Sequence, residues 1–190
     1  MGRYEIHLTV AAASDELPSL AATHGMKYTH IQLDRGEQPS QPMLSRLSDG
    51  TPASAEADAR QTASMLAARG VRVTRLKVEA AASEAATLAG LYFEHHIKLL
   101  LPPDADLSRV RVTAAAHDAH LSRNARRVRA DGVQERFVTQ RRHDAGRPEA
   151  AAALAGLLGA LTGAGWEVAE VEEEWVLVDD NPALDAGWFG

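Results

Sequence analysis

The sequence predicts an α+β protein made of two ferredoxin-like halves, each with the order strand–helix–strand–strand–helix–strand. Segments in which apolar and polar residues alternate, as in half-buried strands, are interspersed with segments of helical periodicity. This order occurs twice, and corresponding residues recur at a near-constant separation, as do His7 and His96 or Gly70 and Gly165. We therefore expect a duplicated βαββαβ unit with two antiparallel sheets, helices outside and a polar cleft between the sheets.

The first half begins with a strictly alternating strand that places His7 and Thr9 on its polar face. Its second helix begins with Thr51 as the capping residue and Pro52 in the first turn, and it ends at Gly70. In chain order, the strands and helices of this half are expected at residues 4–10, 14–25, 28–33, 41–47, 51–70 and 71–80.

The second half repeats this pattern, with a hairpin that turns at Asp131 and Gly132 and a final helix with leucines at core spacing. Its elements are expected at residues 92–101, 104–117, 120–129, 134–142, 148–163 and 166–178. The predicted organisation is therefore a first half at 1–80, an Ala- and Ser-rich linker at 81–90, a second half at 91–179 and a tail at 180–190. We expect the tail to turn back and to dock Trp188 on the body of the protein.

Composition excludes several classes of function. The formal net charge of −6 and the pI of about 5.7 argue against general binding of nucleic acid or of an anionic membrane. The absence of cysteine excludes disulfides, thiolate nucleophiles and cysteine-ligated zinc. No apolar run approaches the roughly 20 residues of a membrane span, and no signal-peptide pattern precedes the first strand. We expect a cytoplasmic protein, and exposed strand edges would allow a homodimer.

The first strand of each half carries a polar face with potential chemistry. Glu5, His7 and Thr9 share one such face, and Glu94, His96 and Lys98 share the other. If the sheets pack against each other, both faces line one cleft between the halves, where small-molecule sites commonly lie. Further side chains that could reach this cleft are Gln32, Ser122, Asn124 and Arg141.

The segment from His7 to Val10 resembles the His-x-Thr-x strand motif of the 2H phosphoesterases. In that superfamily two such strands place two histidines across a phosphodiester as general base and general acid, a role that suits the pKa of imidazole. The resemblance implies catalysis by His7 and His96, with Thr9 and Lys98 as phosphate contacts. It departs from the family pattern because Lys98 stands in place of the second hydroxyl. The implied protein is a phosphoesterase-like hydrolase that needs no cofactor and acts on an anionic small molecule.

A second interpretation is a metal centre formed by His7, Glu79, His96 and Glu174, which occupy the first and last strands of the two halves. Their order is similar to that of the vicinal-oxygen-chelate enzymes, although the repeat of that family lacks the extra helix. This resemblance implies a divalent transition metal that acts as a Lewis acid in a lyase, isomerase or dioxygenase. The alternative for the two glutamates is an ion pair with Lys77 or with an arginine.

A third interpretation is anion binding without catalysis. Arginine binds phosphate and carboxylate well because its planar guanidinium is always charged. The second hairpin holds seven of them: Arg123, Arg126, Arg127, Arg129, Arg136, Arg141 and Arg142. The alternative is a solvated hairpin that is neutralised by the acidic residues of the last strand, among them Glu170 and Glu172. The choice between these three functions stays open at the level of sequence.

Overall fold

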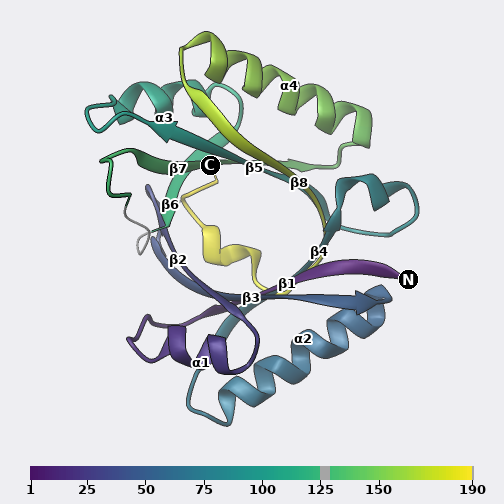
Figure 1. Ribbon diagram of the computed structural model, residues 1–190. Helices are drawn as coiled ribbons and strands as arrows, with labels where there is room; N and C mark the ends of the chain where they lie inside the picture. Colours follow the sequence, from purple (N-terminus) through teal and green to yellow (C-terminus); the bar gives the residue numbers. More distant parts are fainter. Residues whose placement is uncertain (125–128, 190) are drawn as a thin grey trace.

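The computed structural model describes residues 1–124 and 129–189, and these residues form one closed antiparallel β-barrel with four α-helices outside it (Figure 1). The elements of the first half are β1 (Gly2–Val10), α1 (Leu17–Thr23), β2 (Lys27–Leu33), β3 (Ser40–Gly50), α2 (Pro52–Ala67) and β4 (Val73–Ala81). Those of the second half are β5 (Tyr92–Leu101), α3 (Leu107–Ala115), β6 (Ala119–Asn124), β7 (Gln134–His143), α4 (Arg147–Gly163) and β8 (Glu167–Asp179). Two short 3₁₀ helices, η1 (Ala82–Ala86) and η2 (Pro182–Asp185), follow β4 and β8.

The two halves have the same topology. Their strands are ordered β2-β3-β1-β4 and β6-β7-β5-β8, so β1 and β5 hold equivalent inner positions. This order, with two helices on one face, is the ferredoxin-like arrangement that the sequence predicts. The α+β class and the order of elements are therefore as expected.

The prediction of two separate sheets with a cleft between them is wrong. The outer strands of the halves pair with each other, β4 with β8 and β2 with β6, and they close a single sheet. The physical reason is that each half alone would leave two edges of unpaired backbone groups, and mutual pairing satisfies those groups. Closure also removes the exposed edges on which the expectation of a homodimer rests, so a homodimer would need another surface.

The hydrophobic core lies between the outer face of the barrel and the helices, in one cluster for each half. Ile6 and Leu8 of β1 point outward under the helices of the first half, and Ile97 and Leu99 of β5 do the same in the second. Because side chains alternate along a strand, the polar residues between them point into the barrel. The barrel interior is therefore the polar space that the sequence predicts as a cleft.

Local signals place most elements correctly. At the start of α2, Thr51 Oγ1 accepts a hydrogen bond from the Ser54 backbone N–H at 3.2 Å, and Ser54 Oγ accepts one from the Thr51 N–H at 2.8 Å. Differences occur at the ends. β4 and η1 take up much of the predicted linker, and β6 ends at Asn124. Residues 125–128 of the predicted strand, which include Arg126 and Arg127, lie outside the described residues, and Arg129 is not in a strand. None of the helices in the described ranges is long and apolar enough to cross a membrane.

Candidate functional site

The barrel interior contains a cavity of about 290 Å³ that is lined mainly by polar side chains. Six of the predicted catalytic and substrate-binding residues line this cavity: His7, Thr9, His96, Ser122, Asn124 and Arg141. The predicted metal ligands Glu79 and Glu174 line it as well. The structure thus brings together eight of the ten side chains that the sequence nominates.

His7 lies against a buried carboxylate. Its Nε2 is 2.7 Å from Glu79 Oε2 and 3.8 Å from Glu5 Oε1, and the Glu79 side chain is only 1% exposed. Burial alone would lower the pKa of His7, but the charge and contact of Glu79 outweigh it and raise the pKa above its usual value. The second ring nitrogen, Nδ1, is buried and has no hydrogen-bond partner among the described residues.

His96 occupies the equivalent position in the second half. Its Nδ1 lies 3.0 Å from the hydroxyl of Thr139, and its Nε2 lies 3.3 Å from Glu174 Oε2. Burial again lowers the pKa, but Glu174 more than compensates and raises the pKa of His96 to about 9. Burial and repulsion from Glu79 raise the pKa of Glu174. With a pKa of about 9, the His96 imidazole is protonated at neutral pH in the metal-free protein, and Glu79 favours the charged form of His7.

One group of side chains has the geometry of a metal site. Ligand atoms of Glu5, His7 and Glu174 all lie within 4.8 Å of one another. This set shares His7 and Glu174 with the predicted one and adds Glu5, but it contains neither Glu79 nor His96. Glu79 contacts Lys77 and His7 instead. His96 contacts Thr139 and Glu174. Glu5 could have been found from sequence, because it shares the polar face of β1 with His7.

A chain of buried ion pairs runs from the histidines to the other end of the cavity. Lys77 bridges Glu79 and Glu94, with 2.5 Å between Lys77 Nζ and Glu94 Oε2. Arg141 Nη2 lies 3.1 Å from the other oxygen of Glu94. In the described residues, the network joins Arg75, Lys77 and Arg141 to Glu79, Glu94, Asp179 and Asp185, and Glu174 contacts His96 instead. Glu79 and Glu174 lie against the two imidazoles, so the histidines lie in a negative potential.

Two predicted substrate contacts do not line the cavity. Lys98 lies between Glu135 and Glu170, with its Nζ 3.7 and 3.8 Å from their carboxylate oxygens. Its ammonium group therefore forms ion pairs with these glutamates and does not line the cavity. The prediction that Gln32 reaches the cavity is wrong. Thr29, Ile31 and Leu33 of β2 face the cavity, and the Gln32 side chain lies on the opposite face of the strand. Ile31 and Leu33 of β2 therefore point into the barrel, in contrast to the apolar residues of β1.

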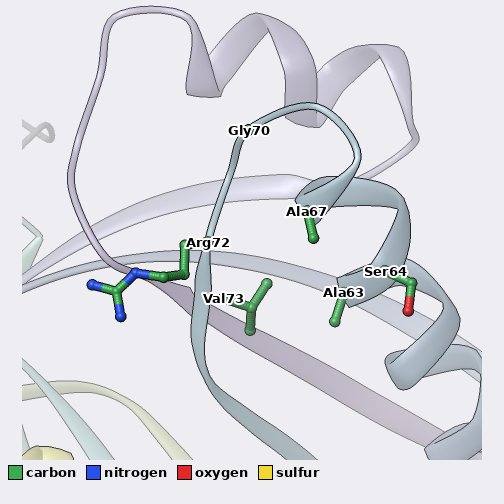
Figure 2. A pocket seen from close by; sticks show the side chains of 6 residues that line it. All are labelled: Ala63, Ser64, Ala67, Gly70, Arg72 and Val73. Carbon is green, nitrogen blue, oxygen red and sulfur yellow. The ribbon is translucent and has the colours of Figure 1, made fainter.

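A second hollow lies on the outer surface, at the end of α2 and the start of β4 (Figure 2). Its lining is small and mostly apolar, namely Ala63, Ser64, Ala67, Gly70, Arg72 and Val73. Arg72 is the one charged side chain in this lining. The hollow therefore offers neither metal ligands nor an acid–base pair, and the barrel interior is the candidate site.

No family model matches the chain, and no curated protein matches it. Among solved structures, it is similar to the small subunit of acetolactate synthase from Thermotoga maritima, with 12% identity and a TM-score of 0.30 over 94% of this chain and 96% of that one. It is also similar to the regulatory subunit of aspartate kinase from Thermus thermophilus, with 13% identity and a TM-score of 0.33 over 84% and 93%. Similarity at this level supports no conclusion about function. The resemblances to 2H phosphoesterases and vicinal-oxygen-chelate enzymes stay predictions.

Proposed function

We propose that the barrel interior binds a divalent transition-metal ion through Glu5, His7 and Glu174, and that the ion holds and polarises an anionic small molecule. The observation that carries this proposal is the convergence of one imidazole and two carboxylates within 4.8 Å. Imidazole and carboxylate together suit first-row divalent metals, and three protein ligands would leave positions open for a substrate.

The surroundings of these ligands favour a cation. Glu79 and Glu172 also line the cavity near His7 and His96, and the buried network has an excess of carboxylates. A divalent ion bound to the neutral imidazole of His7 would offset the negative charge of these carboxylates. Glu79 would then hold the His7 ring, in the way that carboxylates commonly orient a metal-bound histidine.

The substrate class follows from the size and the lining of the cavity. A volume of about 290 Å³ admits only a small molecule. Thr9, Ser122, Asn124 and Thr139 offer hydroxyl and amide groups around it. A bound metal would act as a Lewis acid on an oxygen of that molecule. The proposed class is thus a metal-dependent lyase, isomerase or dioxygenase, as the vicinal-oxygen-chelate resemblance implies.

Acid–base chemistry by His7 and His96 without a metal is the second candidate. It is supported by the presence of both rings in one cavity. It ranks lower because the neighbouring carboxylates raise the pKa of both histidines, which disfavours the neutral form that a general base needs. The loss of Lys98 as a phosphate contact weakens it further. A cytoplasmic location and a homodimer stay predictions for either function.

Elemental analysis of protein purified without chelator, followed by titration with Zn²⁺ and Mn²⁺, tests the proposal. We expect one metal per chain, lost in His7→Ala and Glu174→Gln. The matched control is Glu173→Gln, since Glu173 is the neighbour of Glu174 in β8 but does not line the cavity. Equal metal binding by Glu174→Gln and Glu173→Gln would reject the site. Metal-free protein that binds a phosphodiester between the histidines would favour the second candidate.

A further inference from the structure

The segment that follows β8 turns back into the barrel and closes one end of the cavity. Figure 1 shows it in yellow inside the ring of strands. At the end of η2, Asp185 is 4% exposed and lines the cavity. One oxygen of its carboxylate, Oδ2, lies 2.6 Å from Arg75 Nη1 and 2.7 Å from Arg141 Nη2. The other oxygen, Oδ1, accepts a hydrogen bond from Gln41 Nε2 at 2.8 Å.

These three donors form a carboxylate pocket built from separate strands. Gln41 belongs to β3, Arg75 to β4 and Arg141 to β7, and each is less than 8% exposed. Two guanidinium groups and an amide around one carboxylate satisfy both of its oxygens with charge-assisted or neutral hydrogen bonds. The three donors therefore belong to the barrel wall itself, and the segment supplies the anion, with the Leu184 carbonyl and the Phe189 ring as further contacts of Gln41 and Arg141.

Each arginine keeps another carboxylate partner besides Asp185. Arg75 binds Asp179 through two contacts of 2.6 and 2.9 Å, and Arg141 binds Glu94. Asp185 is thus a single additional negative charge shared between two arginines that are already paired. Removing it would leave an opening for one monoanion, whereas an anion of higher charge would exceed the charge of the pocket.

The rest of the segment is attached at the rim of the barrel. The Arg35 side chain donates to the Trp188 carbonyl at 3.2 and 3.3 Å, and the Trp188 indole donates to the Leu121 carbonyl at 3.3 Å. The Glu37 N–H donates to the Ala186 carbonyl at 2.9 Å. Trp188 is 5% exposed, and the Phe189 ring lies against the Arg141 guanidinium and His120. Among the described residues, no strand pairing of the barrel depends on the segment, so its displacement would leave the barrel closed.

We propose that Gln41, Arg75 and Arg141 form the subsite for a small monocarboxylate ligand, and that Asp185 occupies this subsite in cis. This inference rests on the proposed function in one respect: it assumes that the anionic small molecule proposed above binds in the same cavity, and it places the carboxylate of that molecule at the arginines. The same cavity is lined by His7 and His96, and the ion pairs of Lys77 with Glu79 and Glu94 connect the two regions. A ligand that displaced Asp185 would extend from the arginines toward the histidines.

The test is chemical rescue of Asp185→Ala by acetate, with the full chain and with EDTA present so that no metal contributes. We expect the variant to melt at a lower temperature than the wild type and to recover as acetate is added, relative to chloride at equal ionic strength. The recovery should reach about 5–10 °C when acetate is about 100-fold above its Kd. Asp185→Asn is the matched control, because its amide fills the pocket and should prevent rescue.

A second variant keeps the test decisive if Asp185→Ala does not fold. Trp188→Ala loosens the segment at the rim and leaves the pocket intact, so we expect it to bind acetate in titration calorimetry more tightly than the wild type. Absence of acetate binding by the folded variants would overturn the subsite, and binding of phosphate in preference to acetate would overturn the ligand class. Because these measurements are made in EDTA, their outcome is independent of the metal titrations of Glu174→Gln. Failure of the carboxylate subsite can therefore be distinguished from failure of the metal site.

Discussion

Replacing Lys77 with methionine is the perturbation that tests the buried network most severely. Lys77 is 8% exposed, and its ammonium group lies between Glu79 and Glu94. Burial lowers the pKa of Lys77, but the two glutamates outweigh it and raise that pKa well above its usual value, so the side chain is charged. Lys77→Met removes this charge with little change in volume and leaves two buried carboxylates without their shared partner.

The magnitude follows from what each carboxylate retains. Breaking a buried ion pair costs about 3–5 kcal/mol, because the remaining charge is not solvated. Glu79 keeps His7 and Glu94 keeps Arg141, which places Lys77→Met near the lower limit, about 3 kcal/mol. With an m-value of about 2–3 kcal/mol/M, the urea midpoint should fall by about 1–1.5 M.

Urea unfolding monitored by circular dichroism, in EDTA, measures this loss. Arg60→Met is the control, since Arg60 forms an exposed pair with Glu56 on one face of α2. The double variant Lys77→Met/Glu79→Gln should be more stable than Lys77→Met, because it removes one of the two orphaned charges. A urea midpoint for Lys77→Met equal to that of Arg60→Met would refute the claim that the ion pairs of Lys77 with Glu79 and Glu94 stabilise the fold.

Three further outcomes are expected. Burial, with a contribution from Arg35, lowers the pKa of His120 to about 4, below its unfolded value of 6.5, so the fold loses stability as the pH falls from 6.5 to about 4. Urea midpoints of His120→Gln should fall less than those of the wild type over this window, and an equal fall would contradict the burial argument. Gly36 has φ +112°, and an added Cβ would lie 3.2 Å from the Ala186 carbonyl. Gly36→Ala should therefore cost about 1–3 kcal/mol and speed proteolysis of the C-terminal segment, and unchanged proteolysis would oppose this. Thr51→Ala should lower stability by about 1 kcal/mol in urea unfolding while Thr51→Ser does not, because only alanine removes the capping oxygen.

Local pattern in the sequence was sufficient for the order of elements and for the inward faces of the central strands. Strict alternation in β1, and looser alternation in β5, place His7 and His96 inside the barrel, because the helices cover the apolar parity. The pairing of β4 with β8 and of β2 with β6 depends on contacts between distant segments. The periodicity within these four strands does not show which strands pair, so a closed barrel could not be distinguished from two packed sheets.

The errors in the candidate site have the same origin. Once the barrel closes, its interior accepts Ile31 and Leu33 as well as charged residues, so polarity alone does not show which face of β2 is inward. Lys98 could not be assigned to Glu135 and Glu170 without the register of β5 against its neighbours. Asp185 was also unpredictable, because its place in the pocket depends on the path of the C-terminal segment and not on a motif.

The most direct measurement of the central claim is anomalous diffraction at the absorption edge of zinc or manganese from crystals grown with that metal. The account predicts one peak inside the barrel, between Glu5, His7 and Glu174, with metal–ligand distances of about 2.0–2.2 Å. It also predicts that the peak disappears in crystals of Glu174→Gln. A barrel interior without an anomalous peak at saturating metal, or a peak bound only to surface residues, would contradict it.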